Sequence, residues 1–138
     1  MWWIYALLSA VFAALTAIFA KLGVEKINSN LATGIRTIVV IIMLWALIFA
    51  RGEAKGISHL SRNTLLFLGL SGVATGLSWL FYFKAIQLGN VSQVAPIDKL
   101  SVALTIVLAA VFLKEALTIR TLIGAGCIIA GTIVLIFK

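Results

Sequence analysis

Two neighbouring charges, Asp98 and Lys99, interrupt a long apolar stretch of this 138-residue sequence. A charged side chain at the centre of a membrane helix costs roughly 2.5–3.5 kcal/mol, so charges at that depth usually have a function. The aspartate could hold a cation or a proton, and the lysine could act as a counter-charge or bind a substrate carboxylate. The alternative is structural: if a helix begins at Pro96, Asp98 lies in its first turn and complements the helix dipole. Adjacent helical residues point about 100° apart, so the two charges are not expected to face each other.

Polar side chains recur at helical spacing in two apolar segments. One stripe consists of Ser71, Thr75, Ser78 and Tyr82, with Trp79 beside it. The other consists of Asp98, Ser101 and Thr105. Hydroxyls can bond to the backbone of their own helix, and a stripe of them then serves only helix–helix contact. Because there are two such stripes and one carries a carboxylate, a polar cavity between helices fits them as well as helix–helix contact does.

Arg36 is the remaining charge inside an apolar segment. Its long stem can carry the guanidinium to the lipid headgroups, which is the simpler interpretation. The functional alternative is an anion-attracting group at the mouth of a cavity. The sequence shows no catalytic triad, zinc motif, phosphate-binding glycine loop or paired carboxylates, and Cys127 is its one cysteine. We therefore expect neither an enzyme nor a metal or cofactor site.

The composition explains why these few polar residues stand out. Hydrophobic residues make up 63% of the chain and charged residues 11%, and the mean hydropathy is +1.20. Soluble domains contain roughly 45–50% apolar and about 25% charged residues, and a domain this small could not bury such an excess. A soluble enzyme, a disordered tail, a disulfide-stapled domain and a collagen-like fibre are excluded. The net charge of +7 comes from scattered basic residues beside apolar runs, which indicates membrane anchoring and not nucleic-acid binding.

Five segments are long and apolar enough to cross a membrane, which takes about 20 residues of helix. We expect helices at about 2–20, 31–50, 64–83, 91–113 and 118–137. Their short connections place successive helices antiparallel, which predicts an all-α, five-helix bundle forming one domain over residues 1–138. Glycines such as Gly72 and Gly76 predict tight helix packing within the subunit.

The distribution of basic residues gives little preference for one orientation in the membrane. The side with the N-terminus carries five: Arg51, Lys55, Arg62, Lys114 and Arg120. The other side carries six: Lys21, Lys26, Arg36, Lys84, Lys99 and Lys138. Without the intramembrane Arg36 and Lys99 the six become four, against five. Such a chain is expected to insert in both orientations.

Three motifs follow one another in the second half of the sequence: Lys84-Ala-Ile-Gln-Leu-Gly-Asn-Val-Ser-Gln-Val-Ala-Pro96, Phe112-Leu-Lys-Glu115-Ala-Leu-Thr118 and Leu122-Ile-Gly124-Ala-Gly126-Cys-Ile-Ile-Ala-Gly131. The stretch from Tyr82 to Phe137 resembles the second part of an EamA domain, of the drug/metabolite transporter superfamily. Five helices match one whole domain. The resemblance implies a transporter, and most such proteins carry two domains in tandem as inverted repeats. Their substrate path is lined mainly by the first, third and fourth helices of each half.

With a single domain, this chain is expected to pair with an oppositely oriented copy or with a similar half-sized partner. We expect a multi-pass transporter of small metabolites or drug-like solutes in the plasma (inner) membrane, with no nucleic-acid partner. The expected substrate-binding residues are Ser71, Thr75, Ser78, Trp79, Tyr82, Pro96, Asp98, Lys99, Ser101 and Thr105, with Arg36 at the cavity mouth. Proton coupling through Asp98 is a further hypothesis.

Other functions remain open at this point. A small-multidrug-type exporter or a lipid-linked sugar flippase would share the size and the paired assembly. The first helix, however, has no acidic residue with which a multidrug exporter could hold a cation. A non-transporting subunit that stabilises a larger membrane complex is the alternative from a different class.

Overall fold

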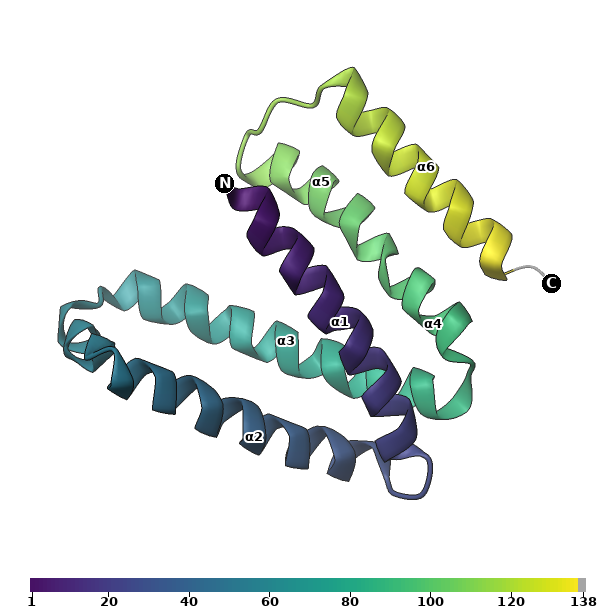
Figure 1. Ribbon diagram of the computed structural model, residues 1–138. Coiled ribbons are helices and arrows are strands. Elements are labelled where there is room, and N and C mark those ends of the chain that lie inside the picture. The colour runs from purple at the N-terminus through teal and green to yellow at the C-terminus, as the bar shows by residue number, and fades with distance from the viewer. Residues whose placement is uncertain (137–138) are drawn as a thin grey trace. The chain divides into compact units, whose positions relative to one another are not determined.

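The computed structural model describes residues 1–136, and Figure 1 shows its helices. They are α1 (Trp2–Val24), α2 (Ser29–Ala50), the 3-10 helix η1 (Glu53–His59), α3 (Arg62–Leu88), α4 (Val91–Asp98), α5 (Leu100–Phe112) and α6 (Ile119–Ile136). Within the described residues five helical segments are long and apolar enough to span a membrane, with α4 and α5 together forming one of them. The expected all-α fold with five spanning helices is confirmed. The chain divides into two compact units, Met1–Gln87 and Leu88–Lys138, which are described in turn.

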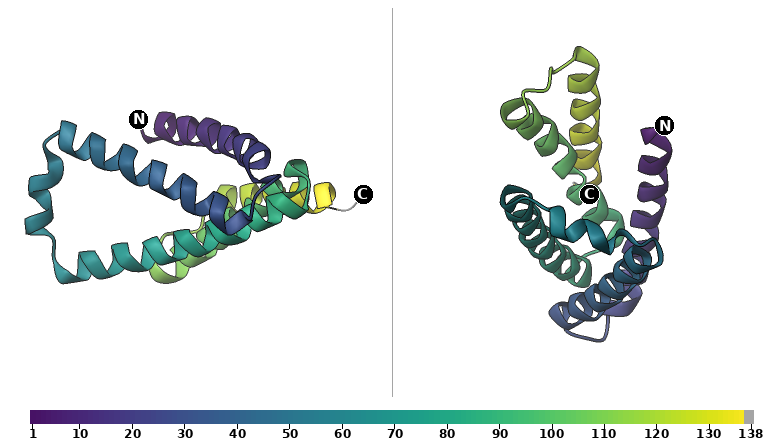
Figure 2. Two further views of the ribbon diagram at one scale, coloured as in Figure 1. Left: turned by 90° about the horizontal axis from the view of Figure 1, so that it is seen from below. Right: turned by 90° about the vertical axis from the view of Figure 1, so that its left-hand side faces the viewer.

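The core of the first unit lies at one end of its three long helices. The buried side chains are Ala17, Ala20 and Val24 on α1, Ser29 and Thr33 on α2, and Phe83 and Ile86 on α3. Small residues on α1 allow α2 to approach closely, and α1 packs directly on α2. The left-hand view of Figure 2 shows α2 and α3 drawing together from η1 toward this end. The two helices are therefore closed at one end and apart at the other.

Polar side chains satisfy the helix carbonyls at the closed end. Lys21 Nζ donates to the Ile86 carbonyl over 2.8 Å, and Gln87 Nε2 donates to the carbonyls of Val24 and Ile27 at 3.2 and 2.8 Å. The last carbonyls of a helix have no hydrogen-bond partner within that helix. Here a side chain of α1 donates to a carbonyl of α3, and a side chain of α3 donates to a carbonyl of α1. These bonds explain why both helices run several residues past the ends expected at 20 and 83.

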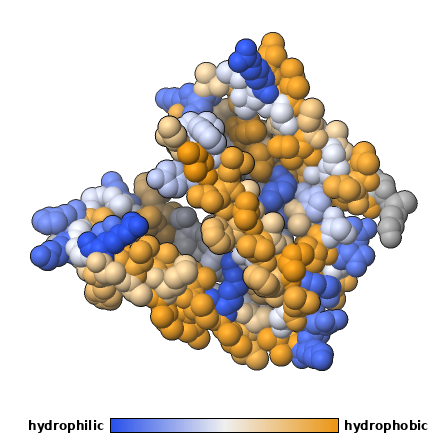
Figure 3. Space-filling model, in the orientation of Figure 1, coloured by the Kyte–Doolittle hydropathy of each residue, from blue (hydrophilic) through white to orange (hydrophobic). Residues whose placement is uncertain are grey.

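The far end of the first unit is a short polar connection. Gly52 adopts a left-handed conformation (φ 68°) that ends α2, and η1 follows it. The side chains of Arg51 and Glu53 are 3.9 Å apart and exposed, a pair that contributes little to stability. Ser61 then begins α3 by accepting a hydrogen bond from the Thr64 amide at 3.1 Å. Figure 3 shows polar residues at this end and apolar residues along the helices, as lipid contact requires.

The second unit consists of α4, α5 and α6, and its fourth membrane segment is broken. The sequence predicted one helix over 91–113, whereas α4 ends at Asp98 and α5 begins at Leu100. Pro96 lies three residues before the break and removes one donor from α4, because its nitrogen cannot donate to the carbonyl one turn earlier. The amides of Lys99 and Val102 bond three residues back instead of four, to the carbonyls of Pro96 and Lys99, both at 3.0 Å.

Helix α6 packs on both halves of this broken segment. Thr118 caps it by accepting a hydrogen bond from the Thr121 amide at 3.2 Å. The Thr132 hydroxyl is buried and lies within hydrogen-bond distance of two carbonyls, Ile128 at 2.8 Å and Pro96 at 3.3 Å. α6 therefore contacts the break through a polar group. The expected end of this helix at Phe137 lies outside the described residues.

Candidate substrate-binding site

Part of the predicted stripe on α3 faces a large cavity. Ser71, Thr75 and Trp79 line a space of about 930 Å³ between α2 and α3, which we call the α2–α3 cavity. The opposite wall comes from α2 and includes the hydroxyls of Thr33 and Thr37. Its remaining lining is largely apolar, with a few hydroxyls at fixed places, as is usual for sites that bind small molecules. Sequence analysis had assigned no residue of α2 to the cavity wall apart from Arg36.

The hydroxyls in this cavity already bond to their own helices. Thr75 Oγ1 donates to the Ser71 carbonyl at 2.8 Å, and Thr37 Oγ1 donates to the Thr33 carbonyl at 2.7 Å. Each oxygen keeps its lone pairs, so it can accept a hydrogen bond from a solute. The same observation fits the structural alternative, in which a hydroxyl stripe is self-satisfied. Ser78, also on the stripe, is exposed and is not among the residues that line the cavity.

Gly72 and Gly76 line the α2–α3 cavity instead of bringing α2 and α3 together. A Cβ atom placed on either glycine would meet no heavy atom of this unit within 4 Å. Tight packing of these two glycines against another helix is therefore not seen within the first unit. The absence of side chains at both positions leaves the cavity wide.

Arg36 packs against aromatic side chains of α3. Its guanidinium carbon, Cζ, is 4.3 Å from the centroid of the Trp79 ring and 5.4 Å from that of Phe83. Its Nη1 atom is buried and donates no hydrogen bond to any residue that the structure describes. Tyr82, the last residue of the predicted stripe, is half-buried and interacts electrostatically with Arg36. The guanidinium is thus held within the unit by aromatic rings.

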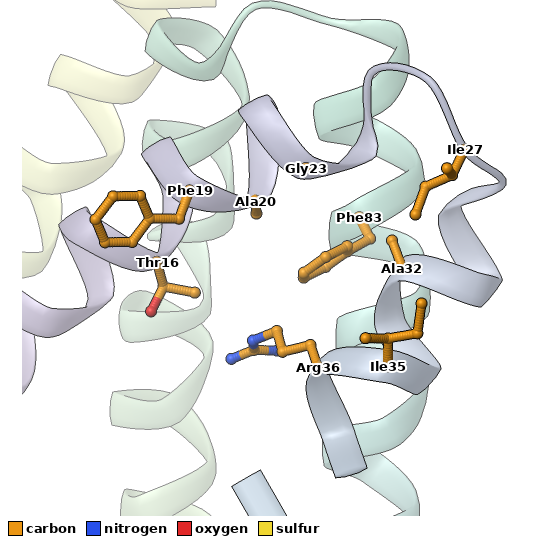
Figure 4. A pocket seen from close by; sticks show the side chains of 9 residues that line it. All are labelled: Thr16, Phe19, Ala20, Gly23, Ile27, Ala32, Ile35, Arg36 and Phe83. Carbon is orange, nitrogen blue, oxygen red and sulfur yellow. The ribbon is translucent and has the colours of Figure 1, made fainter. Parts of the chain in front are cut away.

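A second cavity, the Arg36 pocket, has a volume of about 410 Å³ and lies among α1, α2 and α3. Figure 4 shows the guanidinium of Arg36 pointing into it. The lining residues are Thr16, Phe19, Ala20, Gly23, Ile27, Ala32, Ile35, Arg36 and Phe83. Arg36 is the one charged residue among them. Ile35 also lines the α2–α3 cavity, so the two cavities are neighbours.

The other predicted residues belong to the second unit and surround its broken helix. Pro96 does not begin a helix as the structural interpretation required, because α4 begins at Val91 and Pro96 lies within it. Asp98 is the last residue of α4, not part of a first turn, so it cannot complement the dipole in that way. Lys99 Nζ lies 3.4 Å from Asp98 Oδ2, although adjacent helical residues were not expected to meet. The break at Lys99 separates the two residues from a regular helix and allows this contact.

Two hydroxyls follow the Asp98–Lys99 pair on α5. Thr105 Oγ1 donates to the Ser101 carbonyl at 2.8 Å, and both residues are exposed in the structure. In the part of the chain that the structure describes, no three His, Cys, Asp or Glu side chains are grouped so that they could hold a metal ion. The assignment of these residues to substrate binding stays a prediction.

Several residues of these cavities and of the core beside them escaped the sequence analysis. Phe19 and Phe83 belong to ordinary apolar segments, and nothing local distinguishes them from their apolar neighbours. Thr33 and Thr37, two hydroxyls four residues apart, carried the same signal as the stripe on α3. Gln87 carried a usable signal, because an amide at the end of an apolar helix has few reasons to be there other than to bond backbone groups. Lys21 carried a similar signal.

Known proteins resemble the chain along nearly its whole length. A protein of Sinorhizobium described as an uncharacterized transporter in the cobO 3′ region is 48% identical over 134 residues, covering 97% of this chain and 95% of the relative. An uncharacterized protein of Methanocaldococcus jannaschii is 33% identical over 132 residues, covering 96% of this chain and 93% of the relative. No solved structure matches. The profile of the EamA-like transporter family matches residues 1–137. With its five spanning helices, the chain therefore belongs to the EamA-like transporter family and is a multi-pass membrane transporter.

Proposed function

We propose that the protein moves small amphipathic metabolites or drug-like solutes across the plasma (inner) membrane, working as one half of an antiparallel pair. The pair consists of two copies of this chain or of one copy and a similar half-sized partner. Each half then supplies its own α3 residues to the path. Transport follows from movement of one half against the other.

The α2–α3 cavity is the observation that carries the proposal. It lies between two helices long enough to cross the membrane, and its largely apolar lining carries a few hydroxyls. Its volume of about 930 Å³ suits a metabolite, since ligand sites usually enclose about 300–1,000 Å³. Trp79 offers an apolar wall, and the hydroxyls of Ser71 and Thr75 offer acceptors for polar groups. An amphipathic solute satisfies both.

The broken helix of the second unit supports the same function. Transporters commonly bind substrates where a membrane helix is interrupted, because unwound backbone exposes polar groups there. Here the interruption coincides with the Asp98–Lys99 pair, whose side chains remain partly exposed. The pair offers one charge of each sign to a solute, and Asp98 is the group through which a proton could be coupled.

Antiparallel pairing is supported by length and by charge. Both relatives are covered over more than nine-tenths of their own length, so each has about the length of one five-helix set. The near-equal numbers of basic residues on the two sides permit both orientations. The pairing is tested with a cysteine at position 138 on a Cys127→Ser background, labelled from outside intact cells. Labelling of about half the molecules is expected from dual insertion, and labelling of all or none contradicts the antiparallel homodimer.

Filling the α2–α3 cavity tests the transport site. Gly72→Leu and Gly76→Leu place a side chain into open space, so both variants are expected to fold. Gly69→Leu is the matched control, because Gly69 lies on the same helix with equally open surroundings and does not line the cavity. Proteoliposomes with either cavity variant should release trapped amphipathic solutes no faster than empty vesicles, while the control keeps the wild-type rate. Equal rates in all three would contradict this site.

A further inference from the structure

The Arg36 pocket combines an apolar wall with a single cation. Eight of its nine lining residues are uncharged, and most are apolar. Thr16 is the other polar lining side chain, and its hydroxyl donates to the Phe12 carbonyl at 2.8 Å, which leaves it only as an acceptor. Side-chain donors toward a solute therefore come from Arg36 alone. Figure 4 shows the guanidinium and Thr16 on the same side of this space.

The aromatic contacts of Arg36 leave its hydrogen bonds unused. Cation–π attraction acts through the face of the ring and the face of the guanidinium, and is worth about 0.5–2 kcal/mol depending on desolvation. The five N–H donors point outward in the plane of the guanidinium, where Trp79 and Phe83 cannot accept them. The buried Nη1 confirms this, since no described residue accepts from it. No described carboxylate pairs with Arg36 either.

A cation held in this way is suited to an anion that presents two adjacent oxygens. Carboxylates and phosphates take two parallel hydrogen bonds from a guanidinium, and these charge-assisted bonds are about twice as strong as neutral ones. The aromatic rings fix the guanidinium beforehand, so little side-chain freedom is lost when an anion binds. An anion would also remove the two unfavourable features of the site, namely the uncompensated charge and the buried donor without a partner.

We propose that the Arg36 pocket binds an amphipathic organic anion, with its carboxylate or phosphate on Arg36 and its apolar body against Phe19, Ile35 and Phe83. This gives the transporter a solute class and a binding pocket beside the α2–α3 cavity, and it rests on the proposed function. The pocket volume of about 410 Å³ lies at the lower end of the range usual for ligand sites, so it suits a small solute. A cationic solute is disfavoured by the charge, and a neutral solute leaves the guanidinium unpaired.

The test compares three solutes of nearly the same shape: 4-phenylbutyrate, 4-phenylbutyramide and 4-phenylbutylamine. The full-length protein is placed in nanodiscs of phosphatidylcholine alone, and binding is measured by titration calorimetry. The carboxylate should bind about 10–100-fold more tightly than the amide or the amine, as expected for a hydrogen-bonded charge. Similar affinities for all three would overturn the proposal. Adding phosphatidylglycerol shows whether an anionic lipid competes, which would identify a headgroup as the anion instead of a solute.

Variants locate the anion on Arg36. Arg36→Gln should remove the preference for the carboxylate and leave amide binding in place, while Arg36→Lys keeps the charge and should retain part of the preference. Arg51→Gln is the matched control, since it removes an exposed arginine outside the pocket. If the Arg36 variants do not fold, Gly23→Leu fills the same pocket without a clash and should weaken carboxylate binding. An unchanged preference in Arg36→Gln, or unchanged carboxylate binding in Gly23→Leu, would overturn the assignment.

Flux in vesicles separates failure of this inference from failure of the proposed function. Proteoliposomes that transport the amide or the amine but not the carboxylate contradict the anion proposal and leave the transporter standing. Proteoliposomes that transport none of the three, despite tight binding of the carboxylate, contradict the proposed transport and leave the anion site standing. Faster transport of the carboxylate supports both.

Discussion

The guanidinium of Arg36 lies against the ring of Trp79, with Cζ 4.3 Å from the ring centroid. Arg36 lines the pocket among the first three helices, and Trp79 lines the α2–α3 cavity. The stacked pair therefore lies where the two cavities meet. It connects a residue of α2 to one on α3 that is 43 positions further along the chain.

Replacing Trp79 separates the aromatic contact from simple apolar packing. Trp79→Phe keeps an aromatic face for Arg36, whereas Trp79→Leu removes it. We expect Trp79→Leu to lower the free energy of unfolding by about 0.5–2 kcal/mol more than Trp79→Phe does. Thermal melting of the purified protein in detergent, followed by circular dichroism, measures the difference. Equal melting temperatures of the two variants would mean that the cation–π contact with Arg36 does not stabilise the protein.

Gln87 joins the end of α3 to the loop between α1 and α2 through the carbonyls of Val24 and Ile27. Gln87→Leu should destabilise the protein by about 1–3 kcal/mol, because it removes two hydrogen bonds and leaves the part-buried Val24 carbonyl without this donor. Gln93→Leu serves as the control, since no side-chain hydrogen bond of Gln93 is seen in residues 1–136. Melting temperatures report the outcome, and an equal loss in both variants would show that the bonds of Gln87 contribute nothing special.

Pro96→Ala restores the missing backbone donor in the fourth membrane segment. We expect α4 and α5 to become continuous, with stronger protection of the amides near Lys99 in hydrogen exchange. Stability should rise, since a proline inside a helix costs about 3 kcal/mol. Transport should fall, because the polar break is lost. If the variant gains amide protection and keeps the wild-type transport rate, the break between α4 and α5 is not needed for transport.

Asp98→Asn tests whether the carboxylate takes part in transport. If Asp98 couples a proton, the variant should transport more slowly and lose the dependence of the rate on pH. The salt contact with Lys99 weakens in the same variant, so Lys99→Gln is measured beside it as a control for loss of the pair. Uptake by Asp98→Asn with the wild-type rate and pH profile would end the proton-coupling hypothesis.

Hydropathy was enough to predict the five membrane-spanning helices. Local sequence patterns misplaced helix ends that depend on contacts between residues far apart in the sequence. The spans follow from lipid, which requires about 20 apolar residues of helix. The ends of α1 and α3 were placed too early because Lys21 and Gln87 look like loop residues, whereas each bonds a carbonyl of the other helix. The position of Pro96 was also ambiguous: the sequence allowed a helix from about residue 91 or a start at Pro96, and α4 begins at Val91.

The candidate site was predictable only in part. The stripe on α3 was visible because hydroxyls are rare in apolar segments, and Ser71, Thr75 and Trp79 do line one cavity. The aromatic partners of Arg36 could not be found, because no pattern along the chain relates position 36 to positions 79 and 83. Solvation alone favoured the headgroups for this side chain, and its position relative to them stays a prediction. The structure adds that its guanidinium packs against two aromatic rings.

The one-sided placement of the first unit's core limits where this unit is sensitive to substitution. Val24, Phe83 and Ile86, together with the bonds of Lys21 and Gln87, hold α1, α2 and α3 together at one end. Beyond these contacts, α2 and α3 are joined by the short connection that contains η1. The residues that line the α2–α3 cavity away from this end, such as Gly72 and Gly76, can therefore be exchanged without removing a core contact.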